Sequence, residues 1–390
     1  MLDRYFLRAS CAAHLNTLSA DELFEHWKIT RVANLTGLDQ IGIPVFSVCR
    51  PEGQTVSVNA GKALSLELAR AGAIAEGAEF HTFENPASLG PKKRIYATSS
   101  DLGIDPGLLP WARNANKKEK FEVELVSHFD DGWHQMPSDL FWLCYPDRGG
   151  SELFQQTSNG GAVGPSFEDA FLAGIYECVE RDAISCWTYR WDQTGQSPPL
   201  IDLNSIPETL KAIVAQIQRA NLEVMVFYCT IDIYFPVFWV IILDPYGGLA
   251  PFAGWGCAIE SSEALLRALL EAVQSRAVYI SGARDDVLRR NVEFMQNLDQ
   301  VTLRNAYRDT PKVSLFFDRV FPQPPTAYEE LHLALRRLGD WRKHVYHLTS
   351  YIHHLVAVKT VILGLEPPQN PRWTPSGRAL GWLGSKLPSS

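Results

Sequence analysis

The chain has 390 residues, of which 46% are hydrophobic, 21% charged and 11% aromatic, a composition typical of a soluble globular protein with one large domain or two. This composition excludes a wholly disordered protein, a collagen and a coiled coil. The net charge is -8, since 44 Asp and Glu outnumber 36 scattered Lys and Arg, and this argues against a nucleic-acid binder.

The first hundred residues predict a helix, a strand and a second helix. Residues 19–27 open a polar helix with Ser19 as its N-cap. A turn-prone Thr-Gly-Leu-Asp at 36–39 leads into a β-rich run at 41–48. A helix follows at about 64–79, and the lysine-rich stretch 114–120 predicts an exposed connection or a boundary.

The middle of the chain predicts long helices separated by strands. A Gly-rich turn at 158–161 precedes a helix at about 166–189, and another helix runs from Pro207 to about residue 220. Short β-branched and aromatic runs at 224–231 and 237–243 predict strands, followed by a helix at 261–281. Because strands and helices do not alternate strictly, the pattern predicts an α+β fold with mixed, largely antiparallel sheets rather than a doubly wound fold.

The cysteines and the apolar runs favour a cytoplasmic protein. Seven cysteines, an odd number, form no C-x-x-C pair, which predicts reduced thiols and argues against disulfides or zinc. Residues 1–14 lack the long apolar stretch of a secretory signal. The longest apolar run, 233–243, is too short to span a membrane and contains Pro236.

Three of the predicted helices carry acidic or amide side chains three residues apart. These pairs are Glu76 with Glu79, Glu177 with Glu180, and Glu271 with Gln274. Spacing of three places each pair on one helix face. The neighbouring positions are largely apolar, so the pairs lie in or beside buried surroundings, where a carboxylate needs a partner. One such pair alone is more often a solvated helix face, but three together favour a shared site.

A divalent cation is the partner that these carboxylates favour. Mg²⁺ takes oxygen ligands, usually one or two carboxylates with water and substrate phosphates. Arg181 follows Glu180 directly and Arg276 lies two residues after Gln274, so cations suited to phosphate oxygens occur in the same helices. The combination predicts phosphoryl transfer. Neither a P-loop nor a G-x-G-x-x-G motif is present, so the nucleotide site is built differently.

Three ordered blocks of this sequence resemble the YcaO family, whose members use ATP to activate backbone amides of peptides. The first block is TGLDQIGIPV at 36–45, followed by Arg50-Pro51 and Gly61-Lys62. The second is Ser-Asn-Gly at 158–160 with Glu-Cys-Val-Glu-Arg-Asp at 177–182. The third is Glu-Ala-Val-Gln-Ser-Arg at 271–276, followed by SGARDD at 281–286. The resemblance extends from about residue 31 to residue 366.

The resemblance implies an ATP site that holds magnesium ions through four glutamates, Glu76, Glu79, Glu177 and Glu180. It implies contacts from Arg181 and Arg276 to phosphate oxygens, and Glu271 and Gln274 complete the site. The predicted catalytic group is therefore Glu271, Gln274 and Arg276. Further nucleotide contacts are expected from Asp169, where the family usually has glutamate, and from Lys62.

The sequence departs from the family pattern at three positions, Gly72, Pro165 and Leu363. These departures put nucleotide contacts there in doubt and leave open an ATP-binding accessory protein that modifies nothing. Intact carboxylate pairs argue against that alternative, because unneutralised acidic clusters cost stability. An active enzyme is therefore the favoured interpretation.

In the family, a nucleophile attacks the peptide carbonyl and ATP phosphorylates the resulting oxyanion, so that oxygen leaves as phosphate. Cys, Ser or Thr of the substrate gives an azoline, sulfide gives a thioamide, and an amine gives an amidine. Azoline-forming members often end in Pro-x-Pro-x-Pro, whereas residues 384–390 here hold one proline. Thioamide formation with a separate sulfur-delivering partner is therefore ranked ahead of cyclodehydration.

The resemblance also sets the expected organisation: a helical extension at 1–30, a catalytic domain at 31–370 and a tail at 371–390. The expected partners are a precursor peptide and a separate sulfur-delivering or leader-binding protein, without nucleic acid or membrane. A homodimer is a further expectation from the family, and no interface pattern in the sequence supports it.

Three other features have mainly structural interpretations. His353-His354 could bind metal, but the segment 353–358 reads as the start of a strand, where adjacent side chains face opposite sides. Cys178 and Cys186 share a helix with the glutamates and are expected to be buried small hydrophobes rather than reactive thiols. The Trp-rich stretch 373–382 could cover the substrate or form an oligomer contact.

Overall fold

The computed structural model describes residues 9–86, 95–143, 153–244, 251–283, 307, 312–315, 317, 326–369 and 374–385. Cys144, residues 284–286 of the third motif block, Trp373 and the end of the tail lie outside these ranges. None of the helices in these ranges is long and apolar enough to cross a membrane.

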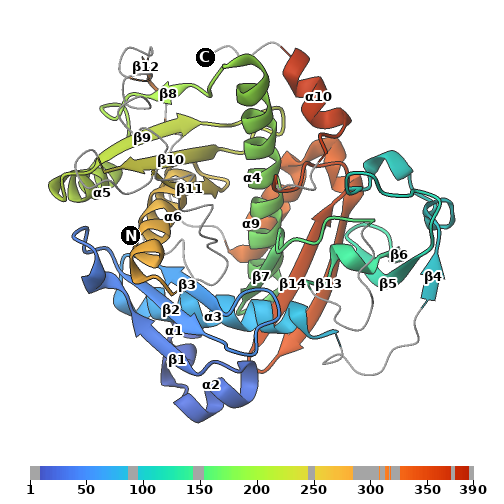
Figure 1. Ribbon diagram of the computed structural model, residues 1–390, viewed down its shortest axis with the longest axis horizontal. Coiled ribbons are helices and arrows are strands. Elements are labelled where there is room, and N and C mark those ends of the chain that lie inside the picture. Colours follow the sequence, from blue (N-terminus) through green and yellow to red (C-terminus); the bar gives the residue numbers. More distant parts are fainter. Residues whose placement is uncertain are drawn as a thin grey trace.

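Helices and strands alternate irregularly along the described chain (Figure 1). The helices are α1 (Ala9–Thr17), α2 (Ala20–Trp27), α3 (Leu66–Glu84), α4 (Phe167–Thr194), α5 (Glu208–Arg219), α6 (Ser261–Ser281), α9 (Ala327–Arg337) and α10 (Gly377–Gly384). The strands are β1 (Arg31–Asn34), β2 (Val45–Cys49), β3 (Val58–Lys62), β4 (Ile95–Ala97), β5 (Phe121–His128), β6 (Trp133–Pro137), β7 (Gly161–Gly164), β8 (Leu200–Ile201), β9 (Glu223–Tyr228), β10 (Val237–Leu243), β11 (Phe252–Cys257), β12 (Lys312–Val313), β13 (Val345–Ile352) and β14 (Leu355–Ile362).

Within the described residues, the strands form three sheets. The first has the order β1-β2-β3, the second β11-β10-β9-β8-β12, and the third β4-β5-β13-β14-β7 with β6 paired to β5. Paired strands run antiparallel except β8 and β12, which are parallel. The prediction of an α+β fold with mixed, largely antiparallel sheets is confirmed.

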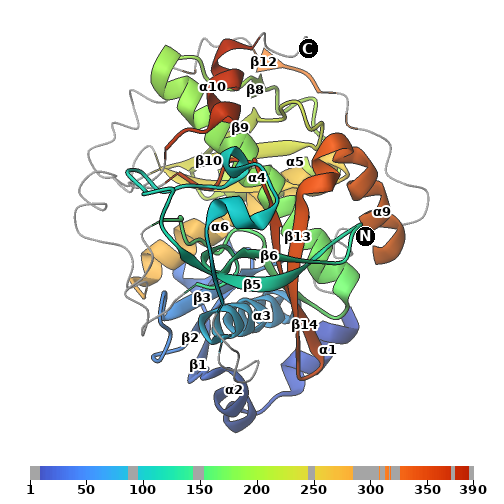
Figure 2. The same cartoon turned by 90° about the vertical axis from the view of Figure 1, so that its right-hand side faces the viewer.

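Three helices occupy the centre of the molecule, each between two sheets. α3 contacts β2 and β3 on one side and β7 and β14 on the other, and α4 contacts β7 and β14 as well as β10 and β11. α6 contacts β10 and β11 together with β2 and β3. Figure 1 shows α4 upright in the middle with α6 beside it and α3 below, and Figure 2 shows the same packing from the side. These are the three helices that carry the predicted acidic pairs.

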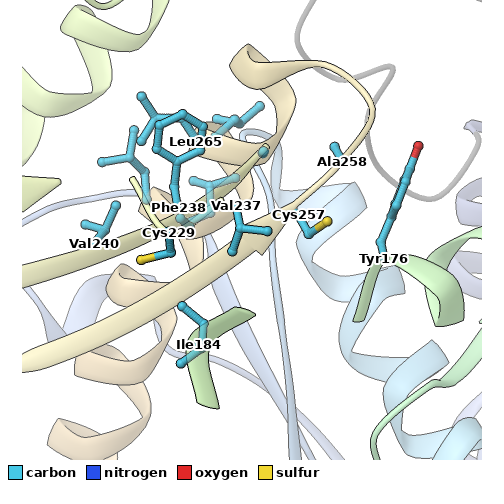
Figure 3. Packing of buried hydrophobic residues seen from close by; sticks show 14 of the residues in the cluster. Tyr176, Ile184, Cys229, Val237, Phe238, Val240, Cys257, Ala258 and Leu265 are labelled. Carbon is cyan, nitrogen blue, oxygen red and sulfur yellow. The ribbon is translucent and has the colours of Figure 1, made fainter. Parts of the chain in front are cut away.

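The largest hydrophobic cluster lies where β10 and β11 pack against α4 and α6 (Figure 3). Phe238 and Val240 from β10 are fully buried, as is Leu265 from α6. Ile184 of α4 closes the cluster from the other side of the sheet. Because β10 is covered on both faces, it is apolar throughout instead of alternating, which is why its sequence reads as one continuous hydrophobic run.

The predicted elements are largely confirmed, with two helices longer than expected. The helix at 261–281 and the strand at 237–243 have the expected bounds, and Ser19 caps α2 with a capping box. α3 continues past residue 79 to Glu84, because Phe83 and Glu84 are buried, and it ends just before Asn85-Pro86. α4 continues past residue 189 to Thr194, where Gly195 adopts the left-handed conformation that ends it.

The histidine pair does not begin a strand, contrary to the expectation. His353 has a φ of 51° and sits with His354 in the tight turn between β13 and β14. The ring of His353 lies 3.5 Å from that of His26, centroid to centroid, and the ring of His354 lies 4.6 Å from that of His14. The two histidines therefore attach this hairpin to α1 and α2, a structural role.

Glycines let the central helices approach their strands to backbone contact. A Cβ at Gly61 of β3 would lie 2.1 Å from the Ala73 nitrogen of α3. A Cβ at Gly254 of β11 would lie 2.1 Å from the Ala272 nitrogen of α6. Both distances are impossible for real atoms, so each strand and its helix are held at a fixed spacing next to the acidic pairs.

Gly61→Ala is expected to destabilise the protein by about 3 kcal/mol, because the added methyl must push α3 away from β3. Gly72→Ala is the matched control. Its Cβ would meet only the Gly61 Cα at 3.7 Å, and alanine favours the helix by up to about 1 kcal/mol. Urea unfolding of both variants tests the contrast. Equal stability of Gly61→Ala and wild type would contradict the close packing.

Candidate functional site

The predicted acidic pairs come together at the centre of the molecule. Glu76 of α3 accepts a hydrogen bond at 2.7 Å from the Ala60 nitrogen of β3. Glu177 of α4 accepts one at 3.1 Å from the Gly160 nitrogen, in the Ser-Asn-Gly turn that the sequence singled out. These backbone donors fix one oxygen of each carboxylate next to a strand.

A chain of ion pairs joins α4, α6 and β3. The Lys62 Nζ lies 3.7 Å from the Glu271 Oε2, and the Arg181 Nη2 lies 3.9 Å from the Glu271 Oε1. Arg181 also lies 3.8 Å from Glu177 and 3.4 Å from Glu180. The guanidinium is placed 4.9 Å from the ring centroid of Trp255 on β11, so its plane is held by a cation–π contact.

The site favours protonation of its glutamates, which marks it as short of positive charge. Burial raises the pKa of Glu79 well above its usual range, and the charges of Glu177 and Glu76 raise it further. Burial also raises the pKa of Glu180 to about 8, although Arg181 lowers it. The pKa of Glu177 is raised by burial too, against the opposing effect of Arg181.

A buried lysine that the sequence analysis did not identify lies beside these glutamates. Lys359 of β14 is 1% exposed and donates hydrogen bonds at 2.7 Å to the carbonyl oxygens of Thr157 and Asn159. Burial lowers its pKa to about 8, whereas the charges of Glu177 and Glu79 act to raise it. Lys359 thus holds the Ser-Asn-Gly turn whose Gly160 positions Glu177.

Two amide oxygens in the same region have no hydrogen-bond partner within the described structure. They are the Oε1 of Gln274, one turn after Glu271 on α6, and the Oδ1 of Asn159. A buried acceptor without a donor carries a desolvation cost, and a cation removes that cost. Both atoms are oxygens, the donor type that Mg²⁺ takes.

The donor set therefore fits Mg²⁺ by its chemistry. Over the part of the chain that the structure describes, no three His, Cys, Asp or Glu side chains form a ready-made metal cluster. Mg²⁺ does not require one, because it usually keeps several waters and binds through one or two carboxylates together with substrate phosphates. Binding of Mg²⁺ by Glu76, Glu79, Glu177 and Glu180 stays a prediction.

Arg276 points away from this ion-pair chain in the structure. Its Nε donates to both carboxylate oxygens of Asp39, at 3.2 and 3.0 Å, and its Nη1 donates to Asp244 at 3.3 Å. Asp39 is the aspartate of the Thr-Gly-Leu-Asp turn, so Arg276 attaches the first motif block to α6. A phosphate contact by Arg276 stays a prediction.

Asp169 lies at the first turn of α4. It accepts a hydrogen bond at 2.7 Å from Ser166, the N-cap residue of that helix. Eight positions separate it from Glu177, which corresponds to about 12 Å along the helix axis. The structure thus places Asp169 apart from the ion pairs of Arg181, and its nucleotide contact also stays a prediction.

The sequence model of one family, described as YcaO cyclodehydratase, ATP- and Mg²⁺-binding, matches residues 60–366. The chain belongs to the YcaO family. This match covers the second and third motif blocks and Lys62, and it confirms the family expected from the sequence. The family description also confirms ATP and Mg²⁺ as the cofactors.

Solved YcaO-type structures share the fold at low sequence identity. A heterocyclase in complex with substrate and cofactor matches with a TM-score of 0.73 and 17% identity, over 97% of this chain and 55% of that one. The YcaO protein of Methanopyrus kandleri bound with AMPPCP and Mg²⁺ matches with a TM-score of 0.66 and 18% identity, over 91% of both chains. The chain thus spans about half the length of the heterocyclase.

Curated relatives are similar in sequence but carry no assigned activity. An uncharacterized protein of Methanothermobacter thermautotrophicus is 27% identical over 80% of this chain and 82% of its own length. An uncharacterized protein in the tfuA 3′ region of Rhizobium leguminosarum bv. trifolii is 28% identical over 70% of this chain and 66% of its own.

Proposed function

We propose that this YcaO protein uses ATP and Mg²⁺ to activate a backbone amide of a peptide by O-phosphorylation. The observation that carries the proposal is the convergence of Glu177, Glu180 and Glu271 around Arg181, at the junction of α4, α6 and β3. Carboxylates beside a guanidinium are suited to a cation and phosphate oxygens together. The fold shared with a heterocyclase solved in complex with substrate and cofactor supports an enzyme rather than an accessory protein. A peptide amide is the group that the family resemblance implies.

In this proposal, Arg181 and Lys62 supply the positive groups that face the phosphates. Arg181 is held by three carboxylates and the Trp255 ring, so it is oriented before nucleotide binds. Glu177 is fixed by the Gly160 nitrogen, and Lys359 fixes that turn in place. When bound, Mg²⁺ neutralises charge on the transferring phosphoryl group and orients it in line.

The proposed reaction replaces the carbonyl oxygen of the amide with the nucleophile. A nucleophile forms a bond to the amide carbon, and the carbonyl oxygen becomes an oxyanion. That oxyanion takes the γ-phosphoryl group of ATP, which leaves ADP. The carbon–oxygen bond breaks, the oxygen departs as phosphate, and the nucleophile has replaced it.

Sulfide is the proposed nucleophile, which makes the product a thioamide. The support is that no Pro-x-Pro-x-Pro pattern, which is associated with azoline formation, occurs in these 390 residues. A separate protein that delivers sulfur is the matching partner. Azoline formation is the second candidate, and the similarity to the heterocyclase fold favours it.

Mass spectrometry of candidate peptides incubated with the protein, ATP and Mg²⁺ separates these outcomes. We expect a gain of about 16 Da that requires sulfide, because sulfur replaces oxygen with phosphate as the other product. A loss of about 18 Da without sulfide would instead establish cyclodehydration. ATP that binds but is never consumed with any peptide or partner would show an accessory protein and contradict the proposal.

A further inference from the structure

A pocket of about 650 Å³ lies on the opposite face of α4 from the glutamates. Asp182 and Cys186 form this opposite face, since the five residues from Glu177 to Asp182 turn the helix through about 140°. Cys186 lines the pocket together with α10, which packs against α4, and with the loop between β9 and β10. Figure 1 shows α10 beside the upper end of α4. The proposed phosphoryl transfer does not use this pocket, although Asp182 beside it ends the second motif block.

The charge of the pocket is set by one arginine between two aspartates. Arg378 of α10 donates to both oxygens of Asp182 at 2.6 Å, and to both oxygens of Asp232 at 2.7 and 3.1 Å. Asp182 is fully buried, so its charge is matched by the guanidinium. The Asp232 side chain is 56% exposed and lines the pocket. The trio therefore carries one surplus negative charge.

A neighbouring thiol experiences the same excess of negative charge. Cys186 is buried in the wall of the pocket, and burial raises the pKa of its thiol well above the usual range. Asp182, Glu366 and Asp232 raise this pKa further, whereas Arg378 lowers it. Three carboxylates thus act on Cys186 against the guanidinium of Arg378.

Aromatic rings form much of the wall. Trp341 and Trp382 line the pocket, and the Arg378 guanidinium already lies 4.7 Å from the ring centroid of Trp341. The Trp382 Nε1 is buried without a hydrogen-bond partner in the described structure. Aromatic faces next to surplus carboxylate favour a cation with an apolar stem, because the faces attract the charge and cover the stem.

One aromatic residue of the wall is held in a strained conformation. Tyr234 has a φ of 54° and is 74% exposed. The loop around it is fixed from inside, since the Thr230 hydroxyl donates to the Phe235 oxygen at 2.8 Å and accepts from the Val237 nitrogen at 3.0 Å. A large exposed tyrosine in the left-handed region carries a conformational cost, and such strain clusters at binding sites.

We propose that this pocket binds an arginine or lysine side chain of the peptide substrate, with Asp232 as the counter-ion and Tyr234 and Trp341 as the walls. This inference rests on the proposed function only for the identity of the ligand as a peptide. The pocket holds the peptide on the face of α4 opposite Glu177. It gives substrate choice a determinant outside the ATP site.

The test is binding of the tripeptide acetyl-Gly-Arg-Gly-amide, followed by tryptophan fluorescence, because Trp341 and Trp382 lie in the wall. The control peptide carries citrulline in place of arginine, because the citrulline side chain has nearly the same shape but no charge. We expect the arginine peptide to bind wild type about fivefold more tightly than the citrulline peptide, and Asp232→Asn to remove that difference. The matched control Asp131→Asn, whose side chain is 86% exposed elsewhere on the surface, leaves it unchanged.

A second pair of variants tests the wall independently of charge. Tyr234→Asn tolerates the left-handed backbone and is expected to weaken arginine-peptide binding about threefold, whereas Tyr234→Phe keeps it. Equal affinity for both peptides, no saturable binding, or unchanged binding by Asp232→Asn would overturn the inference. Because the assay contains no ATP, failure here leaves phosphoryl transfer standing. If wild type consumes no ATP but still prefers the arginine peptide, only the proposed function is overturned.

Discussion

Glu177→Gln is expected to lower ATP-dependent phosphate release at least about 1,000-fold, because it removes a charge that the proposed Mg²⁺ and phosphoryl transfer need. Glutamine keeps the shape of the side chain and can still accept the hydrogen bond from the Gly160 nitrogen. The measurement is phosphate release from ATP with Mg²⁺ and candidate peptides. The control is Glu208→Gln, whose side chain is 86% exposed on α5.

The same variant is expected to remain folded, which separates a lost function from a lost structure. Burial raises the pKa of Glu177, so the folded protein already disfavours the charge that glutamine removes. Thermal unfolding of Glu177→Gln should therefore occur at or above the wild-type temperature. Phosphate release at the wild-type rate from the folded variant would contradict the role given to Glu177.

Arg50→Met is expected to cost about 3–5 kcal/mol of stability, because it leaves a buried carboxylate without its counter-ion. Arg50 and Glu84 are each 1% exposed. The guanidinium donates to Glu84 at 3.0 Å, to Asn59 at 2.8 Å and to the Val56 oxygen at 3.1 Å. These contacts join β2 and β3 to the end of α3, the helix of Glu76 and Glu79.

The double variant Arg50→Met, Glu84→Gln is the control, since it removes the buried Glu84 charge as well as the Arg50 charge that neutralises it. We expect it to be more stable than Arg50→Met alone in urea unfolding. Burial raises the pKa of Glu84, but the hydrogen bonds from Arg50 and Thr55 outweigh burial and hold this pKa below its usual range. The stabilisation is therefore complete above the ordinary glutamate pKa and is lost as the pH falls through the lowered value. A loss of stability on Arg50→Met that is as large in strong acid as at neutral pH would contradict this explanation.

Local patterns were sufficient to predict the central helices and the grouping of Glu177, Glu180 and Glu271 with Arg181. Helical spacing placed Glu177 with Glu180 and Glu271 with Gln274 on single faces, and the apolar neighbours indicated burial. The structure brings Arg181 and Glu271 within 3.9 Å, as one site requires. The predicted helices end five residues before α3 and α4 do. The last turn of α3 is buried by tertiary contacts, and that of α4 continues to the Gly195 cap.

Long-range partners could not be predicted, because nothing local signals them. Lys359 is 182 positions from Glu177, and its strand reads as ordinary β structure. Arg276 pairs with Asp39 across 237 positions, so its partner is visible only after folding. Small residues such as Gly61 and Gly254 are the sequence signal for tight helix–strand packing.

One calorimetric titration tests whether the glutamates of α3 and α4 hold Mg²⁺ together with the nucleotide. AMPPCP is titrated into wild type and Glu177→Gln, with and without Mg²⁺. The account predicts that Mg²⁺ tightens binding to wild type at least about tenfold and has little effect on the variant. Equal affinity with and without Mg²⁺, or an undiminished Mg²⁺ effect in Glu177→Gln, would contradict it.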